Sequence, residues 1–220
     1  MIPLFELRSR SLKREASSAK QHDQAMAIVF LDTEFTDLLD PELLSIGLVA
    51  FARHEGPAEF YVELDLGTAI GQARREASSD FVRYGVFELW GLVPGATCTQ
   101  WEMGHRAGEW LLQVAKESGT RVEVAYDYAT DYELLEYAIR GSGLWGRVRE
   151  VVTPVDVDKV TGNVIGELAA EDCFRSLSKR GLLRHHALAD ALALRAAYTA
   201  VKASALQMAC PSDFDKGRSV

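Results

Sequence analysis

The chain has 220 residues, of which 48% are hydrophobic and 25% charged, and its formal net charge is −8. The length fits one domain, and the composition is ordinary for a globular protein. The negative charge excludes a protein that binds nucleic acid through a broad basic surface, although divalent cations can bridge an acidic protein and a polyanion. The sequence has no apolar run of about eighteen residues, so we expect no membrane span.

The two ends of the chain are predicted to lie outside the folded domain. Residues 1–26 form a polar extension with more basic than acidic side chains, and they lack the apolar core of a signal peptide. Residues 204–220 have the composition of a tail, which leaves 27–203 as the domain. The three scattered cysteines argue against a disulfide framework or a zinc site, and they predict a cytoplasmic location.

Three strand-like segments open the domain. They cover residues 27–35, 42–52 and 59–66, and the connectors between them are short and rich in turn residues. Connectors of this length favour an antiparallel meander. Gly47, inside the second segment, would tolerate the close approach of another backbone.

The rest of the domain alternates helices and strands. The spacing of apolar residues predicts helices over 78–92, 101–119, 130–143, 165–179 and 185–206. Strands are predicted at 121–126 and 154–157. Thr130 and Glu133 have the spacing of a capping box, which places Asp131 in the first turn of its helix. This order predicts an α/β fold in which a meander is followed by crossover units.

Two carboxylates end the first predicted strand, in the stretch IVFLDTEF. Alternate residues of a strand point to the same face, so Asp32 and Glu34 project together, about 7 Å apart along the chain. Carboxylates held this way raise each other's proton affinity unless a cation lies between them. A hard divalent ion such as Mg²⁺ is the natural compensation, because it takes oxygen ligands.

Two further acids and a histidine lie at other junctions between elements. Asp131 opens a helix after a short strand, and Asp190 follows His185 by five residues near the start of the last helix. The carboxyl ends of strands are where α/β sheets gather functional groups. These residues are therefore candidates for the same site as the acid pair of the first strand.

Three stretches together resemble the motifs of a known enzyme family: LDTEF at the first strand, AYDYATDYELL in the middle and HHALADA near the end. They are similar to the three exonuclease motifs of the DEDDh branch of the DnaQ-like 3′–5′ exonucleases, over about residues 27–203. DTEF followed by ELLSIGLVA is especially similar to a bacterial group of 3′–5′ exoribonucleases. The resemblance implies an RNase H-like fold. Its mixed five-stranded sheet would consist of a three-strand antiparallel meander and parallel strands, flanked by helices.

The resemblance also implies a role for each site residue. Two divalent cations, Mg²⁺ or Mn²⁺, would be held by four carboxylates, those of Asp32, Glu34, Asp131 and Asp190. His185 would be the general base.

Two positions in these motifs leave an alternative open. Asp127 is the other candidate for the middle ligand. We favour Asp131, because the family usually has a small polar residue four positions before its aspartate, where Asp127 stands. His186 is the other candidate base. We favour His185 because it has the family's five-residue separation from Asp190, and we expect His186 at the surface or near a phosphate.

The implied activity is hydrolysis of phosphodiester bonds from the 3′ end of single-stranded nucleic acid, with RNA favoured over DNA and nucleoside 5′-monophosphates released. Thr33 is expected to contact the substrate, and Phe35 either to stack on the terminal base or to pack in the core. Homodimers are common in this family, so a homodimer is compatible with the resemblance.

Three other functions were weighed against this one. A proofreading-like, DNA-directed exonuclease would use the same residues. A catalytically silent module that only binds nucleic acid gains nothing from gathering four acids and a histidine. A calcium-binding interaction protein fails on spacing, because no loop has the alternating oxygen ligands of an EF-hand.

Overall fold

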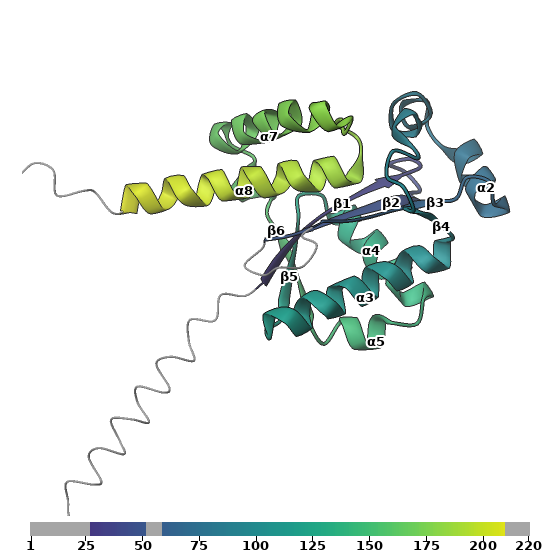
Figure 1. The fold of residues 1–220 in the computed structure, drawn as a ribbon, viewed down its shortest axis with the longest axis horizontal. Helices are drawn as coiled ribbons and strands as arrows, with labels where there is room; N and C mark the ends of the chain where they lie inside the picture. Colours follow the sequence, from purple (N-terminus) through teal and green to yellow (C-terminus); the bar gives the residue numbers. More distant parts are fainter. Residues whose placement is uncertain (1–26, 52–58, 210–220) are drawn as a thin grey trace, which may run out of the picture.

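Six strands form one mixed sheet in the computed structural model, which describes residues 27–51 and 59–209 (Figure 1). Across the sheet the strands follow the order β4-β3-β2-β1-β5-β6. Their bounds are β1 (Ala27–Phe35), β2 (Leu43–Ala50), β3 (Glu59–Leu64), β4 (Thr97–Cys98), β5 (Val122–Tyr126) and β6 (Val152–Asp156). The predicted extension of residues 1–26, and residues 210–220 of the predicted tail, lie outside the described residues.

The first three strands form the predicted antiparallel meander, and the later strands join it in parallel. β2 pairs antiparallel with both β1 and β3, whereas β5 pairs parallel with β1, and β6 with β5. The α/β class with a mixed sheet is confirmed. The count of five strands is wrong, because Thr97 and Cys98 add β4 in parallel beside the end of β3. A strand of two residues is too short to leave an alternating pattern in the sequence.

Helices cover both faces of this sheet. α3 and α4 pack on one face with α5 beside them, while α8 crosses β1 and β2 on the other face and carries α7 on its outer side (Figure 1). The helices are α2 (Ala69–Ala77), α3 (Gln100–Ser118), α4 (Ala129–Gly141), α5 (Trp145–Val148), α6 (Asp158–Thr161), α7 (Val164–Leu177) and α8 (Ala187–Ala209). Among the helices of residues 27–51 and 59–209, none combines the length and apolar character that a membrane crossing would need.

The helix predicted over 78–92 is confirmed only in part, because residues 80–89 are helical but do not form one regular α-helix. Val82–Val86 forms a π-helical turn and Phe87–Leu89 a 3₁₀ turn. The following residues bond to β3 instead of continuing a helix. The Trp90 indole donates to the carbonyl of Leu64 at 3.1 Å, and the amide of Gly91 donates to the Glu63 carboxylate at 3.0 Å. These tertiary contacts override the helical spacing of the apolar residues.

Two helix ends also differ from the prediction. α4 begins at Ala129 with Tyr128 as its N-cap and no side-chain cap, so the predicted capping box of Thr130 and Glu133 is wrong. Asp131 nevertheless lies in the first turn, as predicted. At the other end of the domain, α8 continues to Ala209, beyond the predicted domain end at 203.

β1 divides its side chains between the two layers. Val29 and Leu31 enter the core shared with α3 and α4, whereas Phe30 packs with Leu194 of α8. Alternate residues of a strand point to opposite faces, so Asp32 follows Phe30 to the α8 side of the sheet. The end of this central strand is therefore directed at the start of α8.

Gly47 allows α8 to approach the sheet this closely. It pairs with Asp32 across β1 and β2, and a Cβ at this position would lie 2.3 Å from the carbonyl carbon of Ala187. The backbone of α8 thus occupies the space that any side chain would need. This explains the glycine that the sequence places inside an otherwise apolar strand.

We expect Gly47→Ala to lower the free energy of unfolding by about 1–3 kcal/mol, the usual cost of overpacking a core. Gly141→Ala is a matched control, because a Cβ there meets no atom within 4 Å. Urea unfolding measures both changes. A Gly47→Ala protein as stable as the wild type would show that α8 does not press on β2 at this point.

Candidate functional site

The candidate residues come from three elements whose ends meet at one edge of the sheet. β1 and β5 run parallel with Phe30 opposite Ala125, so their carboxyl ends lie side by side. β1 carries Asp32 and Glu34 at its end, and α4, which follows β5, carries Asp131 in its first turn. α8 crosses β1 from the other direction and brings Asp190 in its own first turn.

Three carboxylates form a tight cluster at this edge. Asp32, Glu34 and Asp190 each offer an oxygen atom, and these oxygens all lie within 4.8 Å of one another. The shared orientation of the first two carboxylates agrees with the alternation predicted for β1. The cluster lies in a cleft of about 450 Å³, the acidic cleft, which is also lined by Asp131 and His185.

Asp131 lies outside this cluster of three and is hydrogen-bonded to β1, the strand that carries Asp32 and Glu34. Its Oδ1 accepts two hydrogen bonds from Thr33, one from the hydroxyl at 2.7 Å and one from the backbone amide at 3.2 Å. Thr33 was predicted to contact the substrate, but its side chain is buried and its hydroxyl is engaged by Asp131. Thr33 also lines the acidic cleft, so its contact with a substrate stays a prediction.

Burial and mutual repulsion hold protons on these acids when no cation is present. Burial, and then the carboxylates of Asp190 and Asp131, raise the pKa of Glu34 to about 8. Burial raises the pKa of Asp131 to about 7, although the hydrogen bonds from Thr33 oppose this change. The pKa of Asp32 is also raised well above its usual value, first by burial and then by Asp190.

The donor set fits a divalent cation. The Oδ2 atom of Asp32 is buried and has no hydrogen-bond partner among the described residues. An unpartnered buried carboxylate oxygen costs free energy unless a proton or a cation compensates it. Oxygen ligands contributed by several acids suit Mg²⁺ or Mn²⁺ rather than a soft metal. The arrangement therefore supports the expected cation site, and the identity of the ion remains a prediction.

His185 stands at the rim of the acidic cleft in an unusual backbone conformation. Its φ is +69°, which places it in the left-handed region that residues other than glycine seldom adopt. Its amide donates to Oδ2 of Asp190 at 2.8 Å, and its ring packs edge-on against Phe81 with centroids 4.8 Å apart. Partial burial, aided by Arg184, lowers the pKa of His185 and favours the neutral imidazole.

The prediction that His186 lies at the surface is wrong, because the residue is buried. Only 2% of its surface is exposed, and its ring stacks on Tyr61 with centroids 4.2 Å apart. It is not among the residues that line the acidic cleft, whereas His185 is. Of the two histidines, His185 is thus the one placed to meet a molecule in the cleft.

The two candidates for the middle acid both line the cleft, but they have different neighbours. Asp131 bonds to Thr33 between the two acids of β1. The pKa of Asp127 is raised first by burial and then by Asp158 and Asp156, which lie toward β6. The contacts of Asp131 are the closer match to the predicted ligand.

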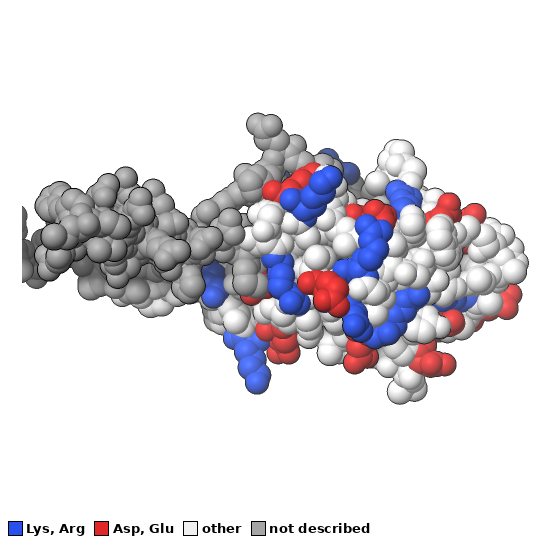
Figure 2. Space-filling view, turned by 90° about the horizontal axis from the view of Figure 1, so that it is seen from below, with Lys and Arg blue, Asp and Glu red and all other residues white. Residues whose placement is uncertain are grey.

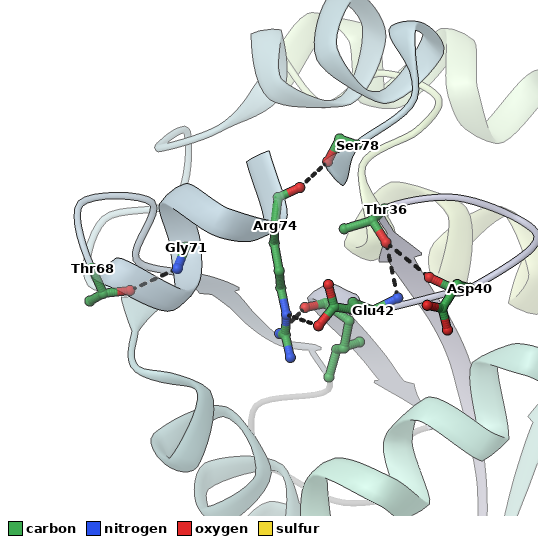
Figure 3. Close-up of polar contacts among 8 residues, drawn as sticks. Thr36, Asp40, Glu42, Thr68, Gly71, Arg74 and Ser78 are labelled. Carbon is green, nitrogen blue, oxygen red and sulfur yellow. Dashed lines mark hydrogen bonds and ion pairs between the residues drawn. The ribbon is translucent and has the colours of Figure 1, made fainter. Parts of the chain in front are cut away.

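A closed turn follows the acidic strand (Figure 3). The Thr36 hydroxyl accepts from the amide of Glu42 at 3.0 Å and donates to the carbonyl of Asp40 at 3.4 Å. Arg74 of α2 is buried and donates to the Glu42 carboxylate and to the carbonyl of Leu43. The turn anchors the end of β1, directly after the position where its pairing with β2 shifts register.

Aromatic rings flank the acids on one side of the cleft. Phe35 is half-buried and stacks on Tyr128, with centroids 6.2 Å apart and planes 20° apart. Both residues line the acidic cleft. The ring of Phe35 therefore packs against a neighbouring aromatic and also faces the cleft, which combines the two readings of this residue.

The structure places three charged residues in the cleft that the sequence prediction missed. They are Asp158, Glu167 and Arg184. Asp158 follows β6, so the rule that located Asp131 after β5 also applies to it. Glu167, in the first turn of α7, has no such signal, and Arg184 is paired with Glu171.

Comparison of the chain with protein-family models and with curated protein sequences found no match to either.

The raised pKa values predict how a divalent cation will stabilise the protein. Groups whose pKa is higher in the native state favour folding while they are protonated, so the metal-free protein should lose stability as the pH rises from 6.5 to 8. Divalent cations bind the deprotonated acids. We therefore expect Mg²⁺ to raise the melting temperature more at pH 8 than at pH 6.5, as measured by calorimetry.

Glu34→Gln is the control for this experiment. It removes one of the coupled acids, so both the loss of stability at high pH and the gain with Mg²⁺ should shrink. Equal stabilisation of wild type and variant at both pH values would contradict a cation site at this cluster.

Proposed function

We propose that this protein is a metal-dependent 3′–5′ exonuclease of the RNase H-like type that acts on single-stranded RNA and releases nucleoside 5′-monophosphates. One observation carries the proposal: three carboxylates within 4.8 Å of one another share a cleft with a further aspartate and a half-buried histidine. These are the residues for which the motif resemblance implies roles. The six-stranded mixed sheet is compatible with the RNase H-like fold, with β4 as an addition at its edge.

Each acid has a stated part in this proposal. Asp32, Glu34 and Asp190 would hold the cations, and Asp131, oriented by Thr33, would complete the set. Bound divalent cations supply activation of a water molecule and stabilisation of negative charge on the scissile phosphate and the leaving oxygen. An acidic protein can in this way accept a polyanion in a cleft that would otherwise repel it.

In this proposal His185 accepts the proton of the attacking water. A general base must be unprotonated at working pH, and burial together with Arg184 favours the neutral ring. The hydrogen bond from its amide to Asp190 fixes the backbone, and Phe81 packs against the edge of its ring. His185 lines the same cleft as the acids.

The cleft has room for one end of a nucleic acid strand. A volume of about 450 Å³ lies in the range of small-molecule sites. Phe35 and Tyr128 offer aromatic surface on which the terminal base can stack without sequence readout. This combination favours removal of single nucleotides from an end over cleavage within a long duplex.

Basic residues outside the cleft do not gather into a single field on the face shown in Figure 2. Seen from the side of α3 and α5, lysine and arginine side chains lie among acidic ones. Several of them are paired, including Arg147 with Glu109 and Arg140 with Glu136. The proposal therefore relies on cations in the cleft rather than on this face to attract the phosphates.

The direct test uses 5′-labelled RNA and DNA oligonucleotides of the same sequence, incubated with Mg²⁺ or Mn²⁺. We expect a ladder that shortens from the 3′ end, runs further on RNA, and disappears with EDTA or in Asp32→Asn. His185→Ala should slow turnover by roughly 10²-fold or more, in the range of a lost general base.

Glu117→Gln is the matched control, because Glu117 is exposed on α3, which covers the opposite face of the sheet. It should leave the ladder unchanged. Asp32→Asn with wild-type activity would overturn the proposed site. Faster degradation of DNA than of RNA would show that DNA is the preferred substrate, and the proposed metal-dependent hydrolysis would still hold.

A further inference from the structure

Three residues on neighbouring strands form a row beneath the start of α8. Asp32 of β1 is opposite Gly47 of β2, which is opposite Tyr61 of β3. Residues opposite one another in adjacent strands present their side chains on the same face of the sheet. The row therefore crosses the sheet from the acidic cluster toward the edge strand.

Each member of this row meets a different residue at the start of α8. Asp32 faces Asp190 in the acidic cluster, and Gly47 leaves space for the backbone of Ala187. Tyr61 stacks on His186, with planes 27° apart. The start of α8 thus contacts the sheet at three points. The stack of His186 on Tyr61 is the contact that lies farthest from the acids.

The stacked ring of His186 acts through packing rather than through charge. It is almost completely buried, and neither ring nitrogen has a hydrogen-bond partner among the described residues. Burial lowers the pKa of His186 to about 4, so the ring is neutral at ordinary pH. What remains is the contact between two aromatic faces.

Tyr61 provides a fixed surface for this contact. Its hydroxyl donates to the Glu63 carboxylate at 3.0 Å. Glu63 is fully buried and also accepts from the hydroxyl of Thr97 at 2.8 Å and from the amide of Gly91 at 3.0 Å. Because β3, β4 and the turn at Gly91 all hold Glu63, the Tyr61 ring is supported from three elements.

The residue before His186 depends on this anchorage. His185 has a φ of +69°, and its backbone amide donates a hydrogen bond to the Asp190 carboxylate. A residue with a side chain keeps such a conformation only when its surroundings enforce it. The chain on the far side of His185 is anchored by the stack of His186 on Tyr61.

We propose that His186 is a positioning residue, whose ring stacks on Tyr61 and thereby fixes His185 and Asp190 beside Asp32 and Glu34. The consequence for catalysis rests on the proposed function. The placement of residues 185–190 does not depend on the proposed function, and it can be measured on the metal-free protein.

The test compares variants that remove a ring with variants that keep one. His186→Ala and Tyr61→Leu remove the stack. His186→Phe and Tyr61→Phe keep an aromatic ring, while Tyr61→Phe loses only the bond to Glu63. Phe60→Leu is the matched control, because Phe60 neighbours Tyr61 in β3 but packs on Trp110 at the other face.

Two measurements report on each variant. In metal-free protein, hydrogen exchange of the amides in residues 185–190 should be about tenfold faster in His186→Ala and Tyr61→Leu than in wild type. Calorimetric titration with Mn²⁺ should show affinity that is about 10–100-fold weaker in these two variants, the usual effect of losing a supporting contact behind a metal site. His186→Phe should restore both values, Tyr61→Phe should stay much closer to wild type than Tyr61→Leu because it loses only the support from Glu63, and Phe60→Leu should change neither value.

A folded His186→Ala protein with wild-type hydrogen exchange and wild-type Mn²⁺ affinity would overturn the inference. A His186→Phe protein whose amides in residues 185–190 exchange as fast as those of His186→Ala would also overturn it. If His186→Ala does not fold, the comparison of Tyr61→Leu with Tyr61→Phe decides. A wild-type protein that degrades no RNA would refute the proposed function alone, since the exchange measurement needs neither substrate nor metal.

Discussion

Repulsion among clustered carboxylates is the constraint on which the rest of this structure depends. Asp32, Glu34 and Asp190 are half-buried and bring oxygens within 4.8 Å of one another in one cleft. Burial raises the pKa of all three, and neighbouring carboxylates add to this, Asp190 acting on Asp32 and Glu34, and Asp127 on Asp190, so without a cation these acids hold protons more readily than usual. A domain gains no stability from such a cluster, because apolar side chains of similar size would be more favourable there. The arrangement has a physical reason once positive charge occupies the cleft.

The fold resists this repulsion by fixing each acid from behind. β1 pairs with β5 up to Phe30, and beyond that point β2 alone pairs with its acidic end, through Gly47 opposite Asp32 and Ser45 opposite Glu34. α8 is pressed against the sheet at Gly47, and the amide of His185 binds the Asp190 carboxylate directly. On the other face, Thr33 holds Asp131 through two hydrogen bonds. Preorganisation of this kind places the free-energy cost in folding rather than in cation binding.

The parts of the site that local periodicity determines could be predicted from the sequence. Asp32 and Glu34 share a face because β1 is a strand, and Asp131 reaches the same edge because a helix follows the parallel strand β5. The roles of Thr33 and His186 could not be predicted, because each depends on a residue brought near by the fold: Asp131, 98 positions away, and Tyr61 on another strand. β4 could not be predicted for the same reason, because two residues are too few to show an alternation of apolar and polar side chains and the strand forms only beside β3.

The central claim, that these acids form a cation site, is tested most directly by anomalous diffraction from metal-free crystals soaked with Mn²⁺. Manganese is expected in the acidic cleft, coordinated directly by oxygens of Asp32, Glu34 and Asp190, with a second ion about 4 Å away on the side of Asp131, as in two-metal sites. An empty cleft at saturating Mn²⁺, or manganese bound elsewhere while the three carboxylates stay apart from it, would contradict the claim.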